Sequence, residues 1–164
     1  MSELAPFNLA AERERIERHA ATQLGLMLFE YSRLEMELGL HIVWADEGKT
    51  LDELTDRLKD SAINKRLLFL QQYVARKYAD GGEAVSAYAA WLQEAHEVRA
   101  LRNDFVHGRW GPWGRGHGVR NVVGMPTSSE QREVCYTPEQ LEQIVQRIKD
   151  LRSEHARLRG IWPV

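Results

Sequence analysis

The sequence predicts a mainly α-helical protein, an up-and-down helical bundle with a small β-hairpin before the C-terminal helix. Three observations indicate this class: apolar residues recur in steps of three and four, polar caps precede these patterns, and a glycine-rich break lies at 108–118. With 164 residues the chain is long enough to bury one core. We therefore expect a single helical domain over residues 1–164, with the hairpin and last helix (119–160) as a C-terminal embellishment.

The first half of the chain predicts three helices. Asn8 can cap a helix over about 9–45, whose inner face carries Leu24, Met27, Leu28, Tyr31, Leu34, Leu38 and Ile42. Thr50 and Glu53 form a capping-box pattern for a short helix. Ser61 is placed to cap the next helix, with Ile63, Leu67, Leu70 and Val74 on one face, before the break at 80–82.

The second half predicts two more helices around the hairpin. The fourth helix has a seam with alternating steps of four and three: Ala84, Tyr88, Trp91, Ala95, Val98, Arg102 and Phe105. Gly108 is expected to end this helix in a left-handed conformation. Residues 119–125 and 131–136 predict two short strands. Thr137 as the cap and Pro138 in the first turn then begin the last helix.

Composition and charge narrow the function classes. No run approaches the roughly eighteen apolar residues of a membrane span, and the N-terminus lacks a signal-peptide pattern. The single cysteine, Cys135, excludes an internal disulfide framework and a cysteine-rich zinc site, which favours a cytoplasmic location. The net charge of −2 argues against a broadly basic nucleic-acid surface. However, residues 96–120 hold five arginines and two acids, which is consistent with a local anion site.

Arg102 occupies a core position of the fourth helix, which requires an explanation because arginine is costly to bury alone. The Arg102 guanidinium could reach water if this residue lies at the end of the seam. Alternatively, it could pair with a carboxylate such as Glu30 or Glu35, or it could line a polar site. Asn103 and His107 are four residues apart and share a face, whereas Arg102 and His107 lie about 140° apart around an ideal helix. Two copies related by a twofold axis would bring both pairs to one cleft.

The segment "RNDFVH" (102–107) resembles the arginine, polar residue and histidine pattern of the HEPN superfamily of helical RNases. The segment "YSRLEMELGLHIVW" (31–44), with its Leu34-Glu35 pair, is similar to the long early helix of that family. The resemblance covers about residues 20–110. It implies a HEPN-like domain with metal-independent endoribonuclease activity, a homodimer with a composite site, no cofactor, and a role as a toxin or defence effector with an antitoxin partner.

The resemblance also implies roles for the motif residues. His107 would act as the general base toward the RNA 2′-hydroxyl, Arg102 would bind the phosphate, and Asn103 would orient His107 or donate to the phosphate. Family members that are paired with a nucleotidyltransferase antitoxin carry a tyrosine two residues after the histidine. Arg109 stands at that position here, which argues against this form of regulation.

Other residues around the motif are candidates for substrate binding. Trp110 and Trp113 could stack on RNA bases, although tryptophans in such a loop more often anchor it to the core. The remaining candidates are Arg99, Arg109, Arg115 and Glu35. His41 and His155 lie on apolar stripes and are expected to be satisfied core or interface histidines.

Two other interpretations stay open from the sequence. In one, the chain is a non-catalytic dimeric helical module in which Arg102 and His107 bind an anionic ligand, a nucleotide or a protein partner. In the other it is a purely structural or partner-binding bundle. No metal-ligating cluster is evident, and we expect neither DNA nor a membrane as a partner.

Overall fold

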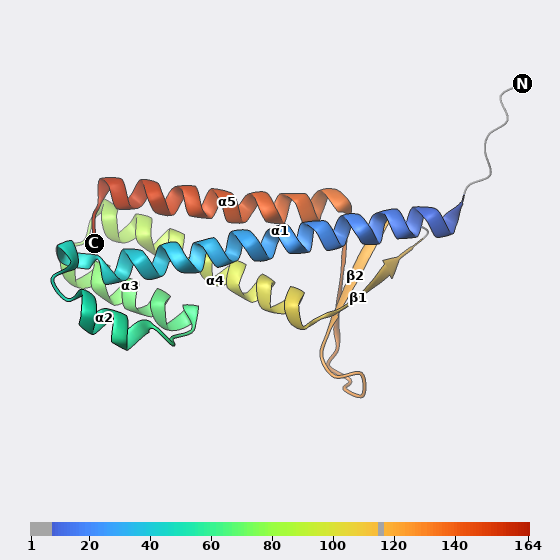
Figure 1. Ribbon diagram of the computed structural model, residues 1–164, viewed down its shortest axis with the longest axis horizontal. Helices are drawn as coiled ribbons and strands as arrows, with labels where there is room; N and C mark the ends of the chain where they lie inside the picture. Colours follow the sequence, from blue (N-terminus) through green and yellow to red (C-terminus); the bar gives the residue numbers. More distant parts are fainter. Residues whose placement is uncertain (1–7, 115–116) are drawn as a thin grey trace, which may run out of the picture. The chain divides into compact units, whose positions relative to one another are not determined.

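A computed structural model describes residues 8–114 and 117–164 of the chain. Within these ranges the elements are α1 (Leu9–Val43), a 3-10 turn η1 (Ala45–Gly48), α2 (Leu51–Leu58), α3 (Ile63–Lys77), α4 (Glu83–His107), β1 (Arg109–Trp113), β2 (Gly118–Val123), β3 (Arg132–Tyr136) and α5 (Pro138–Ile161) (Figure 1). The predicted class, mainly α with a small antiparallel sheet before the last helix, is confirmed. None of the described helices has both the length and the apolar character of a membrane span.

The chain folds as two compact units. The first unit consists of Met1–Leu28 and Arg102–Val145, and the second consists of Phe29–Leu101 and Gln146–Val164. The motif at 102–107 therefore lies in the first unit, and the two predicted histidines of the core lie in the second. Each unit is described separately below.

The first unit contains a three-stranded antiparallel sheet in the order β1-β2-β3. The prediction of two strands was incomplete because β1 lies in the glycine-rich segment. In β1, Gly111 and Pro112 pair opposite Arg120 and Val119. An edge strand tolerates this composition, since proline at an edge removes no hydrogen bond to a central strand. The sheet therefore follows the end of α4 directly.

The predicted helix starts are confirmed only in part. At α5, the Gln140 amide donates to Thr137 Oγ1 (3.3 Å) and the Thr137 amide donates to Gln140 Oε1 (2.8 Å), as in a capping box. At α2, Thr50 is the N-cap, but its side chain makes no capping bond. At α3, the N-cap is Ala62, and Ser61 instead donates to the Leu58 carbonyl (2.8 Å). Both of these capping predictions were wrong.

The core of the second unit is formed by the seam of α4 and by apolar side chains of α1, α3 and α5. The side chains of Tyr88 and Trp91 are almost fully buried, and each also donates a hydrogen bond. The Trp91 indole reaches the Leu151 carbonyl (2.9 Å), and the Tyr88 hydroxyl reaches the Trp162 carbonyl (3.0 Å). Because large aromatic groups bury well only when their polar atoms find partners, these bonds fix α4 against α5 within this unit.

A histidine pair lies in the same core. His41 on α1 and His155 on α5 are buried, and His41 Nδ1 lies 2.8 Å from His155 Nε2. The ring of His155 also stacks on Trp91 with centroids 4.7 Å apart. Burial lowers the pKa of His41 to about 3, with the charges of His155 and Arg159 adding to the effect. Burial and then Arg159 lower the pKa of His155 to about 4. The prediction of satisfied core histidines is confirmed.

The histidine pair predicts acid sensitivity. The folded chain keeps both rings neutral, whereas the unfolded chain protonates them near their ordinary pKa of 6.5. The pair's contribution to the free energy of unfolding is therefore complete above about pH 7. It decreases below pH 6.5, by roughly 1 kcal/mol per pH unit for each ring. Urea unfolding of the full chain at pH 7, 6 and 5 measures this loss.

The control is the half-buried His96 on α4. A His96→Gln variant should show the same pH dependence as the wild-type chain. Ring proton resonances in NMR provide a direct check, because neither His41 nor His155 should titrate between pH 6 and 7. A titration of either ring in that range would contradict the assignment.

Candidate functional site at the end of α4

All six residues of the motif lie on the last turns of α4, which ends at His107. Arg102 and Asn103 are half-buried, and His107 is exposed. The Arg102 guanidinium donates to Asn103 Oδ1 (3.3 Å), so these two polar side chains form one group. Phe105, which follows in the seam, is buried. The motif therefore presents an exposed imidazole one turn beyond an arginine and amide pair.

The sheet holds the end of α4 by hydrogen bonds to its last carbonyl groups. The carbonyl of Asp104 accepts from the Gly108 amide (2.8 Å) and from Asn121 Nδ2 on β2 (3.1 Å). The carbonyl of Phe105 accepts from the indole of Trp110 on β1 (2.9 Å). Carbonyls in the last turn of a helix have no partner within the helix, so these side chains act as a C-terminal cap. The position of His107 is thus supported by the adjacent sheet.

Gly108 allows this cap, although not in the predicted way. It is absent from the described glycines with positive φ, so the prediction of a left-handed stop was wrong. A Cβ atom on Gly108 would instead lie 1.7 Å from Asn121 Oδ1. Glycine is required here because the Asn121 side chain occupies the space next to the backbone. Asn121 itself is buried, with 2% of its surface exposed.

Asp104, the only acidic residue of the motif, is held by the sheet. Its carboxylate forms an ion pair with Arg132 on β3 at 2.5 Å. The pKa of the Tyr136 hydroxyl is raised, mainly by burial and then by the Asp104 charge. The rings of Phe105, Trp110 and Tyr136 contact one another with centroid distances of 5.1 to 5.9 Å. The pairing with Arg132 compensates the Asp104 charge beside Arg102 and His107.

The structure gives the predicted binding residues of the first unit different surroundings. Trp110 anchors β1 to α4, which is the anchoring role that the sequence left open, whereas Trp113 is 39% exposed. The Arg109 guanidinium donates to the Gly124 carbonyl and to Gln131 Oε1 (2.7 Å), so it ties β1 to the turn between β2 and β3. Arg115 lies outside the described residues.

Two further candidates belong to the second unit. Arg99 and Glu35 are both half-buried, and Arg66 on α3 donates to the Glu35 backbone carbonyl (3.1 Å). Glu30, which was considered as a partner of Arg102, forms ion pairs with Arg33 (2.5 Å) and Arg152.

Sequence reasoning did not identify Asn121, Arg132 or Tyr136 as supports of the motif. Asn121 carried a signal that was available, because an asparagine inside a predicted strand is unfavourable unless its amide has a specific partner. The partners of Arg132 and Tyr136 depend on strand register, which determines which side chains face α4. Among residues 8–114 and 117–164, no group of three or more His, Cys, Asp or Glu side chains is arranged to bind a metal ion.

Comparison with protein-family models, curated proteins and solved structures found no match to this chain. The interpretation of the motif therefore depends on its own geometry.

The cap at the end of α4 predicts that Gly108→Ala destabilises the fold. The new methyl group would displace the Asn121 side chain and weaken its bond to Asp104, at a cost of about 1–3 kcal/mol. Urea unfolding at pH 7 measures this change in the free energy of unfolding.

Gly25 on α1 is the matched control, because a Cβ there meets nothing within 4 Å. Gly25→Ala should stabilise the chain by about 0.5–1 kcal/mol, as expected inside a helix. Adding Asn121→Ser to Gly108→Ala should recover part of the loss. Equal unfolding free energies for Gly108→Ala and the wild-type chain would contradict the role of Gly108.

Proposed function

We propose that the chain is a metal-independent endoribonuclease whose site is formed by Arg102, Asn103 and His107. The observation that carries this proposal is the exposed His107 imidazole at the rigidly capped end of α4, one turn after the half-buried Arg102–Asn103 pair. A general base must be accessible and held in position, and an arginine supplies the donors that a phosphate group needs. The resemblance to HEPN ribonucleases supports the same assignment.

The reaction uses the nucleophile that RNA carries. Neutral His107 accepts the proton of the 2′-hydroxyl, and the 2′-oxygen attacks the adjacent phosphorus. The bond from phosphorus to the 5′-oxygen breaks, and the leaving oxygen takes a proton from solvent. Arg102 stabilises the negative charge that develops on the phosphate oxygens. The products are a 2′,3′-cyclic phosphate and a 5′-hydroxyl.

Cleavage of a fluorescent RNA by the purified full chain in excess EDTA tests this proposal. His107→Ala and Arg102→Ala should each reduce the rate by about 100-fold or more, in line with the usual contribution of a general base or an oxyanion donor. Asn103→Ala should have a smaller effect. Circular dichroism confirms that the variants are folded.

His96→Ala on the same helix is the control and should retain the wild-type rate. The product should carry a cyclic phosphate, which mass spectrometry detects. Equal rates in the wild-type chain, His107→Ala and Arg102→Ala would indicate a contaminating nuclease and overturn the proposal. Absence of cleavage of a mixed total RNA would also overturn it.

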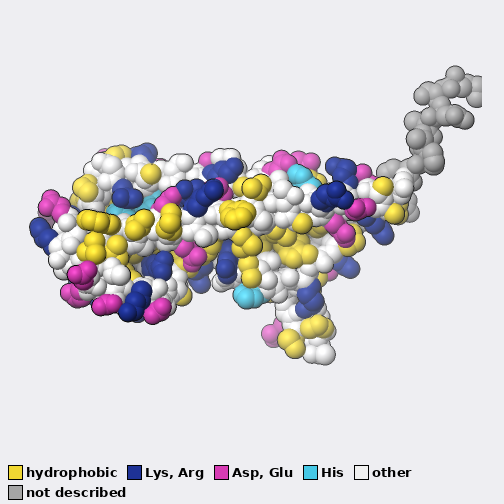
Figure 2. Space-filling view, viewed as in Figure 1, with side chains coloured by type: hydrophobic (Ala, Val, Ile, Leu, Met, Phe, Trp, Pro, Cys, Tyr) yellow, Lys and Arg dark blue, Asp and Glu magenta, His cyan; other side chains and the backbone are white. Residues whose placement is uncertain are grey.

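We further propose that the chain forms a homodimer, as the resemblance to HEPN ribonucleases implies, through an exposed apolar stripe on the part of α1 that belongs to the second unit. Phe29, Met36 and Leu40 repeat on one face, with Trp44 just beyond the helix end, and each is 50–65% exposed. Figure 2 shows hydrophobic side chains gathered over this half of α1. A contiguous apolar surface of this kind is typical of an interface, because leaving it in water is costly.

If two copies meet through this stripe, a charge placed in it should separate them. Met36→Asp combined with Leu40→Asp should weaken the dimer by at least about 10-fold in sedimentation equilibrium, because two carboxylates would have to be buried. Ile161→Asp changes an equally exposed apolar residue of the same unit and should leave the dimer intact. A wild-type chain that is monomeric at tens of micromolar would contradict this part of the proposal.

A further inference from the structure

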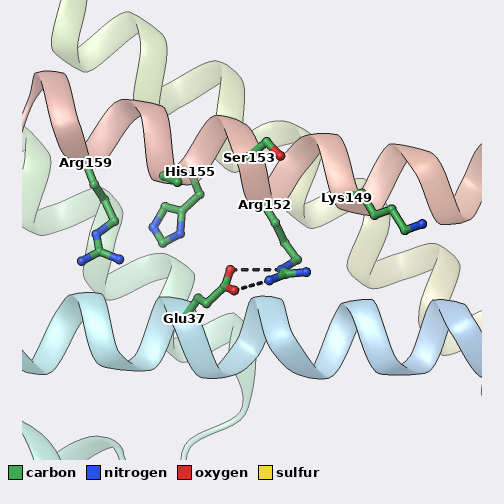
Figure 3. Close-up of a pocket in the computed structure, with 7 residues that line it drawn as sticks. Glu37, Lys149, Arg152, Ser153, His155 and Arg159 are labelled. Atoms are coloured by element: carbon green, nitrogen blue, oxygen red, sulfur yellow. Dashed lines mark hydrogen bonds and ion pairs between the residues drawn. The ribbon is translucent and has the colours of Figure 1, made fainter.

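The second unit contains a polar cavity that is separate from the proposed ribonuclease site. It has a volume of about 440 Å³ and lies between α1 and α5, lined by Glu37, Lys149, Arg152, Ser153, His155, Ala156 and Arg159 (Figure 3). This volume is within the range of small-molecule sites in proteins. All of the lining residues except Ala156 carry a polar or ionisable side chain, so the cavity differs from an ordinary packing defect, which is apolar.

Arg152 is a fixed part of the cavity wall. Its guanidinium binds both carboxylate oxygens of Glu37, and a third N–H group donates to Glu30 Oε2. A guanidinium has five N–H donors, so two of them stay available for a further acceptor. The carboxylates of Glu37 and Glu30 together outweigh the single positive charge of Arg152. They also hold the Arg152 guanidinium in one orientation.

Arg159 contributes a charge that has no ion-pair partner among the residues that the structure describes. It lies seven residues after Arg152, on the same face of α5, and forms no ion pair with any of the residues that the structure describes. Its positive charge contributes to lowering the pKa of both His41 and His155, which shows that this charge reaches the buried pair. Lys149, at the other end of the cavity, likewise has no ion pair among the described residues.

Between the two arginines the wall is formed in part by the neutral, buried ring of His155. His155 is 1% exposed, its Nε2 is occupied by His41, and its ring stacks on Trp91. The cavity therefore combines the Arg159 guanidinium, which has no ion pair among the described residues, with N–H groups of Arg152 that remain after its bonds to Glu37 and Glu30. The Glu37 carboxylate in the wall is already bound to Arg152, so the remaining donors have no acceptor among the described lining residues.

We propose that this cavity binds a small phosphate-bearing molecule. The phosphate group would accept hydrogen bonds from Arg159, since a guanidinium binds phosphate through paired donors. Arg152 lies roughly 10 Å away along α5, so its remaining N–H groups would bind an acceptor on another part of the same molecule. The rest of the volume would hold the organic part of the molecule, with Lys149 and Ser153 at the edge. This site does not depend on Arg102 or His107, so it can be tested independently of the ribonuclease activity.

Inorganic phosphate is the first probe, used with the full chain at constant ionic strength against sodium chloride. Phosphate should raise the melting temperature in step with the logarithm of its concentration above Kd, because a ligand at concentration c that binds only the folded state stabilises it by RT ln(1 + c/Kd). Arg159→Gln should weaken the apparent affinity by at least about 10-fold, since it removes the guanidinium that binds the phosphate. Arg157→Gln is the matched control, because Arg157 is two positions away, is exposed and pairs with Glu154 at 2.6 Å.

NMR of the histidine rings locates the binding. Phosphate should shift the ring resonances of His155 in the wild-type chain and in Arg157→Gln, but not in Arg159→Gln, and His96 should not respond. A stabilisation that is equal in Arg159→Gln, or His155 ring shifts that do not saturate with phosphate concentration, would show a general salt effect and overturn the site. Saturation of the His155 ring shifts at a lower concentration of acetate than of phosphate would overturn the phosphate assignment. Displacement of phosphate by a short RNA would overturn the small-molecule assignment.

Discussion

The carbonyl groups in the last turn of α4 are the constraint on which the first unit depends. A helix end leaves such groups without partners inside the helix, and burying them unpaired is costly. Asn121 and Trp110 donate to two of them, which requires β1 and β2 to follow the helix closely. This approach is possible only because residue 108 has no side chain. The sheet is therefore a structural cap for the helix that carries the motif.

This cap explains why a histidine can be both exposed and well positioned. His107 is the last residue of α4, where helix ends commonly fray. Here the bonds to Asp104 and Phe105, together with the Asp104–Arg132 ion pair, hold the preceding turn against the sheet. In the proposed ribonuclease this support would matter, since catalysis depends on a fixed geometry of the base and the phosphate donor.

The second unit pairs most of its polar groups within the core. The two histidines bind each other and stay neutral, because charging either one would leave a buried ion beside Arg159. Arg147 binds Glu94 and Glu97, and this raises its pKa further above its ordinary value. Arg159 makes no such ion pair among the described residues, and it lines the cavity beside the histidine pair.

The candidate site was predictable in its location but not in its support. The seam of α4 predicted that Arg102 would lie next to buried residues, and the structure has it half-buried before the buried Phe105. Helical spacing also predicted that Arg102 and His107 point in different directions. The roles of Asn121 and Arg132 were not predictable, because they depend on which strand residues face the helix. The hydrogen bonds from Arg109 to Gly124 and Gln131 were not predictable from the sequence for the same reason.

The sequence by itself determined the helices and their buried faces, because apolar periodicity is a local property that survives in any packing. It also determined the break after α4 and the helix cap at Thr137. Tertiary structure decided the features that depend on contacts across the chain. Residues 109–113 form the strand β1 although they include a glycine and a proline. Gly108 lies close to the Asn121 side chain, and His41 forms a hydrogen bond with His155. These outcomes depend on neighbours that are distant in the sequence, and no local pattern specifies them.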